Sequence, residues 1–145
     1  MNYWICITNQ KNWDIIYNKG VWGVSQAYMD ILSQVEIGDK ILFYIKGGKV
    51  KSIFKATSKM YESKEKIFNI ISIYKKNEIF PYRINLKQIS HNIMEINIYN
   101  ILKFLKITKD KKNWGACFFR AMIKISIDDY KILKQNMKEE SRISI

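Results

Sequence analysis

The chain is poor in the residues from which most catalytic and metal sites are built. Its 145 residues include two cysteines, Cys6 and Cys117, and a single histidine. Two distant cysteines are too few for a disulfide framework or a zinc site, and one histidine argues against a His-based metal centre or a catalytic triad. The carboxylates fall mostly in caps, turns and exposed helix positions, so no acid–base pair stands out. We therefore expect a protein that is not an enzyme and that holds no metal or cofactor.

Long hydrophobic runs are missing as well, and the pattern of the first residues does not predict a leader sequence. No apolar run approaches the roughly 18 residues of a membrane span, and the first residues lack a basic segment followed by a long apolar one. We therefore expect a soluble protein of a reducing, cytoplasmic compartment. The 48% hydrophobic and 14% aromatic content excludes disorder. We expect one domain over residues 1–145, with residues 138–145 as a frayed tail.

Charge of one sign is in excess, because 25 lysines and arginines face 13 acidic residues and give a net charge of +12. Basic residues gathered on one face would bind nucleic-acid phosphates, whereas scattered lysines form only a solvated surface. Lysine, isoleucine and asparagine are all abundant, which an AT-rich coding genome also produces. Lysines do group near turns, as at Lys46, Lys49 and Lys51. Both interpretations of the charge stay open.

The pattern of side chains predicts an α+β fold in which mostly antiparallel strands close into a small barrel. The β-branched and aromatic run at 3–8 predicts a central strand buried on both faces. Asn9 and Gly20 suit the two ends of a helix, and Gly47-Gly48 suits a hairpin. Further strands are predicted at 21–24, 40–45, 50–61, 82–89 and 122–125. Helices are predicted at 25–35, from Asn97 or Asn100, and at 126–137, with a helix or irregular crossover at 62–76.

Trp22 is the most suggestive single side chain. In Gly20-Val21-Trp22-Gly23 a large ring stands next to glycines, where the backbone can approach a ligand closely. Trp114-Gly115 repeats the pattern in a basic loop. A base stacked on such rings gains about 1–3 kcal/mol. Alternatively, each tryptophan plugs an end of the barrel.

Several motifs, in this order along the chain, resemble those of the EVE domain family. They are Tyr3–Asn9, Trp13, Gly20–Ser25, Val35–Tyr44, Phe80–Ile84 and Trp114–Arg120. The similarity covers roughly residues 2–134. It implies a PUA-like fold, a small β-barrel flanked by helices, related to the YTH domain that reads methylated adenine in RNA.

The resemblance also implies a base-binding site. Trp22 matches one wall of the aromatic cage of YTH domains. Thr8 and Asn9, with Asn12 nearby, match polar residues that hydrogen-bond the base, and Gly23 offers only its backbone. Three aromatic residues are regional candidates for the second cage wall: Tyr44, Phe43 and Tyr61. Trp114 completes the base-binding candidates, and the expected contacts to the nucleic-acid backbone are Lys46, Lys49, Arg83, Lys111, Lys112 and Arg120.

These observations predict a non-enzymatic module that recognises a modified, methylated base in DNA or RNA. The alternative is a pocket protein of the same fold that binds a free nucleoside or nucleotide. A nucleic-acid hydrolase and a protein-interaction module are further possibilities. The sequence leaves open the polymer, the modification, the convergence of the lysines and the oligomeric state.

Overall fold

The computed structural model describes residues 1–68, 78–90 and 92–139. Its strands are β1 (Tyr3–Thr8), β2 (Val21–Val24), β3 (Lys40–Ile45), β4 (Lys49–Ala56), β5 (Tyr61–Glu62), β6 (Tyr82–Gln88), β7 (Met94–Asn97), β8 (Met122–Ile125) and β9 (Lys138–Glu139). Its helices are α1 (Gln10–Lys19), α2 (Met29–Leu32) and α3 (Ile127–Asn136), with short 3-10 turns at η1 (Gln26–Tyr28), η2 (Ile98–Asn100) and η3 (Trp114–Phe118).

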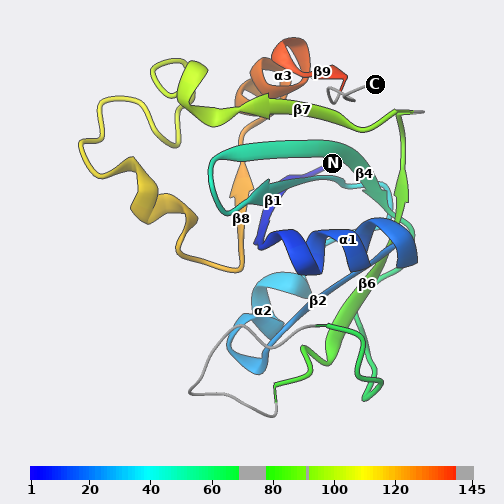
Figure 1. The fold of residues 1–145 in the computed structure, drawn as a ribbon. Coiled ribbons are helices and arrows are strands. Elements are labelled where there is room, and N and C mark those ends of the chain that lie inside the picture. The colour runs from blue at the N-terminus through cyan, green and yellow to red at the C-terminus, as the bar shows by residue number, and fades with distance from the viewer. Residues whose placement is uncertain (69–77, 91, 140–145) are drawn as a thin grey trace.

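The strands form one mixed sheet that curls into a half-barrel (Figure 1). The main order is β2-β6-β4-β3-β1-β8, and β5, β7 and β9 are attached to its margins. Among the described strands, only β1 and β3 pair in parallel, and the other pairs are antiparallel. Strand β4 changes partner at Ser52, whose φ of 57° bends the chain. Its first half pairs with β7 and its second half with β6, which lets the sheet curl.

The central strands separate two hydrophobic cores. Along β1, Trp4 and Cys6 face the core beneath α1 and α2, whereas Ile5 and Ile7 face the core beneath α3. Strand β3 alternates in the same way, because successive side chains of a strand point to opposite faces. Figure 1 shows α1 and α2 on one side of the sheet and α3 on the other. The prediction of a central strand buried on both faces is confirmed.

Helix α1 has the predicted ends. The side-chain oxygen of Asn9 accepts a hydrogen bond from the backbone N–H of Asn12 at 2.8 Å, which satisfies a donor of the first turn. Gly20 closes the helix at φ 65°, and its N–H donates to the Ile16 carbonyl. The cap sets the direction in which α1 leaves β1.

Other predicted elements are wrong in detail. The helix predicted at 25–35 is a 3-10 turn followed by the short α2, because Tyr28 (φ −111°, ψ 9°) leaves the helical region. The helix predicted from Asn97 or Asn100 is replaced by η2 and a series of turns. Ile98, Ile101 and Leu105 are nevertheless buried, so their helix-like spacing reflects a core contact made by irregular chain.

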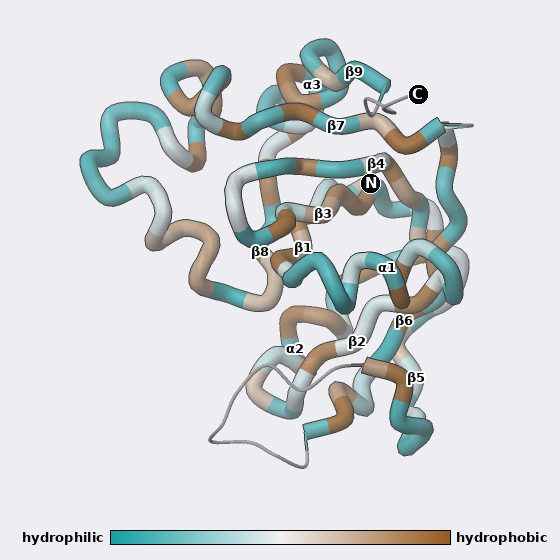
Figure 2. The backbone as a smooth tube through the Cα atoms, in the orientation of Figure 1, coloured by the Kyte–Doolittle hydropathy of each residue, from teal (hydrophilic) through white to brown (hydrophobic). Residues whose placement is uncertain are grey.

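The remaining differences lie at the margins of the sheet. Strand β4 ends at Ala56, and the predicted extension to residue 61 is interrupted before β5. Strand β9 pairs with β7 where the sequence predicts a frayed tail. The helix or irregular crossover predicted at 62–76 extends outside the described residues. None of the described helices is long and apolar enough to cross a membrane. Figure 2 shows that the loop leading to β8 is hydrophilic at its outermost turn and more hydrophobic where it returns to the strand.

Candidate functional site

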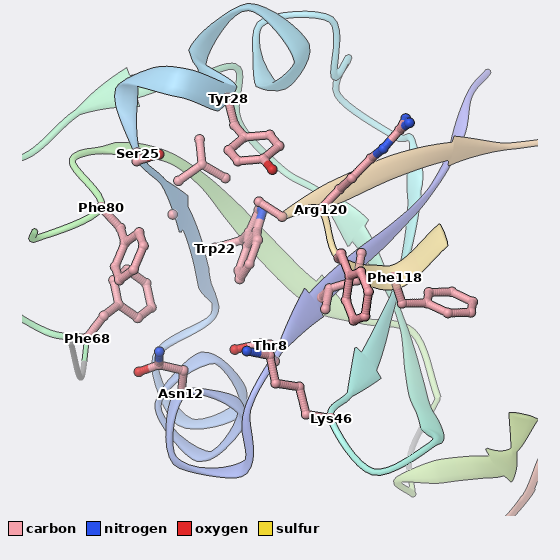
Figure 3. A pocket seen from close by; sticks show the side chains of 15 residues that line it. Thr8, Asn12, Trp22, Ser25, Tyr28, Lys46, Phe68, Phe80, Phe118 and Arg120 are labelled. Carbon is pink, nitrogen blue, oxygen red and sulfur yellow. The ribbon is translucent and has the colours of Figure 1, made fainter. Parts of the chain in front are cut away.

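A cavity of about 280 Å³ opens between the end of β1, strand β2 and the loop before β8. Its lining residues come from segments far apart in the sequence (Figure 3). They are Ile7, Thr8, Asn12, Trp22, Gly23, Val24, Ser25, Tyr28, Lys46, Phe68, Phe80, Phe118, Phe119, Arg120 and Ala121. Ligand pockets typically measure about 300–1,000 Å³, so this cavity suits one small flat group.

The pairing of the central strands brings these segments together. The Lys46 N–H donates to the Thr8 carbonyl at 2.9 Å, which places the β3–β4 hairpin beside the end of β1. On the other side of β1, the Ile7 N–H donates to the Ala121 carbonyl at 2.8 Å and holds the loop before β8. Because Asn9 caps α1, Asn12 turns toward the cavity from the first turn of the helix. Thr8 and Asn12 are 3% and 4% exposed.

Trp22 forms a wall of the cavity from β2. Its indole packs edge-on against Phe43 of the core, with ring centroids 5.5 Å apart, and the side chain is 5% exposed. Its Nε1 is buried without a hydrogen-bond partner among the described residues. Such a donor costs about 1–3 kcal/mol unless an acceptor arrives. The indole therefore combines a fixed apolar face with an unsatisfied polar atom.

A second aromatic wall comes from the segments that flank residues 69–77. Phe68 and Phe80 lie at one side of Trp22 in Figure 3, and their ring centroids are 6.0 Å apart. Gly23 permits their approach, because a Cβ there would lie 2.7 Å from both a Phe68 ring carbon and the Phe80 carbonyl oxygen. The glycine thus shapes the cavity through its lack of a side chain.

Arg83 holds this second wall in place from β6, where it is the register partner of Gly23. Its Nε donates to the Phe80 carbonyl and its Nη2 to the Ile79 carbonyl, both at 3.0 Å, and Nη2 also donates to the Glu65 carbonyl. The guanidinium carbon lies 5.4 Å from the Phe68 ring centroid. Desolvation lowers the pKa of Arg83, an effect opposed by nearby Tyr61 and Glu65.

No carboxylate side chain is among the described residues that line the cavity. Lys46 and Arg120 are both exposed at its edge. Within the described parts of the chain, neither forms a salt bridge. Among the described residues, the site is therefore apolar and aromatic inside and positively charged at its entrance.

The structure brings together four of the seven predicted base-binding residues, namely Thr8, Asn12, Trp22 and Gly23. The Asn9 side-chain oxygen instead caps α1. Tyr44 stacks behind Phe118, with centroids 4.2 Å apart and planes 3° apart, and belongs to the opposite core. Burial, and secondarily Tyr99, raises the pKa of Tyr44.

Trp114 also packs away from the cavity, edge-on to Tyr99 and Phe118. The regional candidates for the second wall do not line the cavity either. Phe43 lies in the core, and the Tyr61 hydroxyl donates to Asn85 Oδ1 at 2.6 Å.

The predicted cationic residues separate into groups. Lys46 and Arg120 stand at the cavity, whereas Lys111 and Lys112 are exposed elsewhere on the loop. Arg83 is 2% exposed and bound to carbonyl groups, so its charge faces the interior.

Lys49 reaches Glu95 at 2.8 Å. With Lys46 and Lys51 it lines a second cleft beside the first residue of α1, so part of the predicted lysine group does converge. Glu95 also lies 3.7 Å from Lys51 and offsets part of the charge of this cleft.

Nine of the lining residues were not among the predicted site residues: Ile7, Val24, Ser25, Tyr28, Phe68, Phe80, Phe118, Phe119 and Ala121. The Phe80-Pro81 pair and the Phe118-Phe119 pair were visible signals. Phe68 carries no local signal, since only the fold brings it to Trp22. Over residues 1–68, 78–90 and 92–139, no group of three His, Cys, Asp or Glu side chains could hold a metal ion.

Comparison with known proteins gives this geometry a context. The family model described as EVE domain matches residues 2–136. A UPF0310 protein of Pyrococcus horikoshii is 37% identical over 146 residues, covering 93% of this chain and 98% of that protein. Among solved structures, the YTH domain of Zygosaccharomyces rouxii MRB1 in complex with N6-methyladenosine RNA has a TM-score of 0.63 at 17% identity, covering 99% of this chain and 89% of that one.

The Pho92 YTH domain in complex with m6A gives a TM-score of 0.65 at 15% identity, with 97% and 85% coverage. At these identities the similarity concerns the fold. The predicted α+β, PUA-like architecture is confirmed.

Proposed function

The chain belongs to the EVE domain family, and from this premise we propose that it binds a modified base of a nucleic acid in the cavity beside Trp22, without catalysing a reaction. The observation that carries the proposal is the buried Trp22 indole, which walls an aromatic cavity while its N–H has no partner among the described residues. A base offers both a flat face for the ring and acceptor atoms for such a donor.

The composition of the cavity supports a base as the occupant. Phe68 and Phe80 face the site from one side, and Thr8 and Asn12 bring polar groups to its floor. An apolar methyl group enclosed by aromatic rings contributes about 0.8 kcal/mol, which is less than tenfold discrimination. Shape and hydrogen bonds to the base edge must therefore supply the remaining selectivity.

The fold similarity supports the same proposal. The structures of the MRB1 and Pho92 YTH domains contain N6-methyladenosine RNA and m6A, respectively. Extracting a base from a duplex costs a few kcal/mol, so we expect single-stranded ligands to bind more tightly than duplexes.

The test is a fluorescence-anisotropy titration with matched nine-mers of DNA and RNA. Each is unmodified or carries one N6-methyladenine or 5-methylcytosine, in single- and double-stranded form, at two salt concentrations. We expect one modified single strand to bind more tightly than its unmodified match. Trp22→Phe keeps an aromatic ring but removes the N–H and part of the wall. It should lower the affinity for the modified strand about tenfold or more.

Trp13→Phe is the matched control. Trp13 is 2% exposed and also packs against Phe43, with centroids 5.6 Å apart, but it does not line the cavity. Trp13→Phe should therefore cost stability without changing the preference for a modified base. Equal binding of modified and unmodified strands by the parent protein would refute the proposal.

A free nucleoside or nucleotide is the second candidate, favoured by the small volume of the cavity. It predicts that a modified nucleoside binds as tightly as the nine-mer that contains it. Its affinity would also change little with salt, because counterion release depends on polymer phosphates.

A further inference from the structure

The edge of the cavity carries an aromatic ring that no core contact explains. Phe119 is 83% exposed, the largest exposed fraction among the described large hydrophobic residues. It nevertheless lines the cavity together with the buried Phe118. A base inserted beside Trp22 would leave this outer ring free to contact whatever is attached to that base.

The backbone at Phe119 is held by its neighbours. Phe118 stacks on Tyr44 with ring centroids 4.2 Å apart and planes within 3°. The Phe119 N–H also donates to the Ala116 carbonyl at 3.3 Å. Because the preceding residue is anchored inward, the next side chain is directed outward at little further cost in backbone entropy. An exposed ring on a held backbone can stack a base of any sequence.

Two cations accompany the ring. Arg120 follows Phe119 directly, and Lys46 stands on the β3–β4 hairpin; in Figure 3 their side chains extend from separate points of the cavity edge. None of the described residues that line the cavity is acidic. The combination of a stacking surface with positive charge is complementary to a nucleotide, which has an aromatic base and an anionic phosphate.

We propose that Phe119, Arg120 and Lys46 form an outer subsite for the nucleotide adjacent to the inserted base, so that the ligand is a single-stranded stretch of nucleic acid. This inference rests on the proposed function and extends it, because a free nucleoside can fill the cavity beside Trp22 but cannot reach the outer subsite. Phosphates next to the inserted base then interact with Arg120 and Lys46, while the adjoining base stacks on Phe119.

The test compares Phe119→Ala with the parent on two sizes of probe. The probes are the N6-methyladenosine RNA nine-mer, the 5-methylcytosine DNA nine-mer and the corresponding free nucleosides. Phe119→Ala should lower the affinity for the preferred nine-mer about tenfold and leave the affinity for its nucleoside within about twofold of the parent value. The matched control is Phe104→Ala, which removes a ring that is 55% exposed beside Lys103 and away from this cavity. It should change neither affinity.

Two further readouts report on stacking and charge. With 2-aminopurine next to the modified base, binding to the parent should quench its fluorescence, and binding to Phe119→Ala should not. Arg120→Gln and Lys46→Gln should each flatten the slope of log affinity against log salt by about 0.7, the value for one phosphate contact on a single strand.

Several results would overturn the subsite. One such result is that Phe119→Ala binds the nine-mer as tightly as the parent does. Another is that the substitution lowers the affinity for the nucleoside as much as the affinity for the nine-mer. Sedimentation could show self-association of the parent that Phe119→Ala abolishes, in which case a second copy covers this ring. If Trp22→Phe weakens binding while Phe119→Ala does not, only the outer subsite fails. If the parent binds neither nine-mer, the proposed function fails with it.

Discussion

Replacing Arg83 by methionine tests whether a buried cation, rather than a surface one, shapes the candidate site. The guanidinium donates to the carbonyls of Ile79, Phe80 and Glu65. We expect water to replace the donor at Glu65, an exposed residue, but not fully at Ile79 and Phe80, which are half-buried residues. A hydrogen bond from a charged donor contributes about 1.5–3 kcal/mol. Two such bonds, less the desolvation cost that methionine avoids, suggest that Arg83→Met lowers the free energy of unfolding by about 3 kcal/mol.

The backbone at Phe80 links this loss to the cavity. Phe80 has a φ of 51° immediately before Pro81, a conformation unfavourable for a bulky residue and for one that precedes proline. Arg83 stabilises it by binding the carbonyls of Ile79 and Phe80. Without these bonds we expect the segment to relax and the wall formed by Phe68 and Phe80 to move away from Trp22.

Thermal unfolding and oligonucleotide titration measure the two effects. For a chain of about this size, 3 kcal/mol corresponds to a decrease in Tm of roughly 6–12 °C. Lys87→Met is the matched control, because it removes one exposed positive charge from the same strand. It should change Tm by less than about 2 °C. A Tm and a modified-strand affinity for Arg83→Met that match those of Lys87→Met would refute the reasoning.

Two smaller changes test other parts of the description. Gly23→Ala places a Cβ 2.7 Å from a Phe68 ring carbon. It should lower the affinity for the modified nine-mer at least about tenfold and the free energy of unfolding by roughly 1–3 kcal/mol. An affinity equal to that of the parent would contradict the close approach. Burial raises the pKa of the Cys6 thiol well above its usual value, so this thiol should stay protonated. The folded Cys117→Ser variant should therefore have no thiol that reacts with Ellman's reagent at pH 8. Rapid labelling of native Cys117→Ser protein would show that Cys6 is accessible.

The local sequence determined those elements that depend mainly on interactions between residues close together in the chain. The continuous run of β-branched and aromatic side chains over Tyr3–Thr8 predicted a strand buried on both faces, and its two faces do contribute to separate cores. Asn9 and Gly20 marked the ends of α1 because capping depends on a few neighbouring backbone groups. The motif around Trp22 left open a ligand contact or a plug at one end of the barrel, and the structure places this side chain both in the wall of the cavity and in the core beneath α1 and α2.

Tertiary structure decided what depends on contacts across the sheet. Ile98, Ile101 and Leu105 have the spacing of a helix but are buried by irregular chain, since burial requires only that side chains reach the core. Arg83 and Arg120 look alike as basic residues in sequence. One is buried against carbonyl groups because β6 pairs with β2, and the other is exposed at the cavity. Charge and composition follow from the sequence, whereas the direction in which each charge points follows from strand pairing.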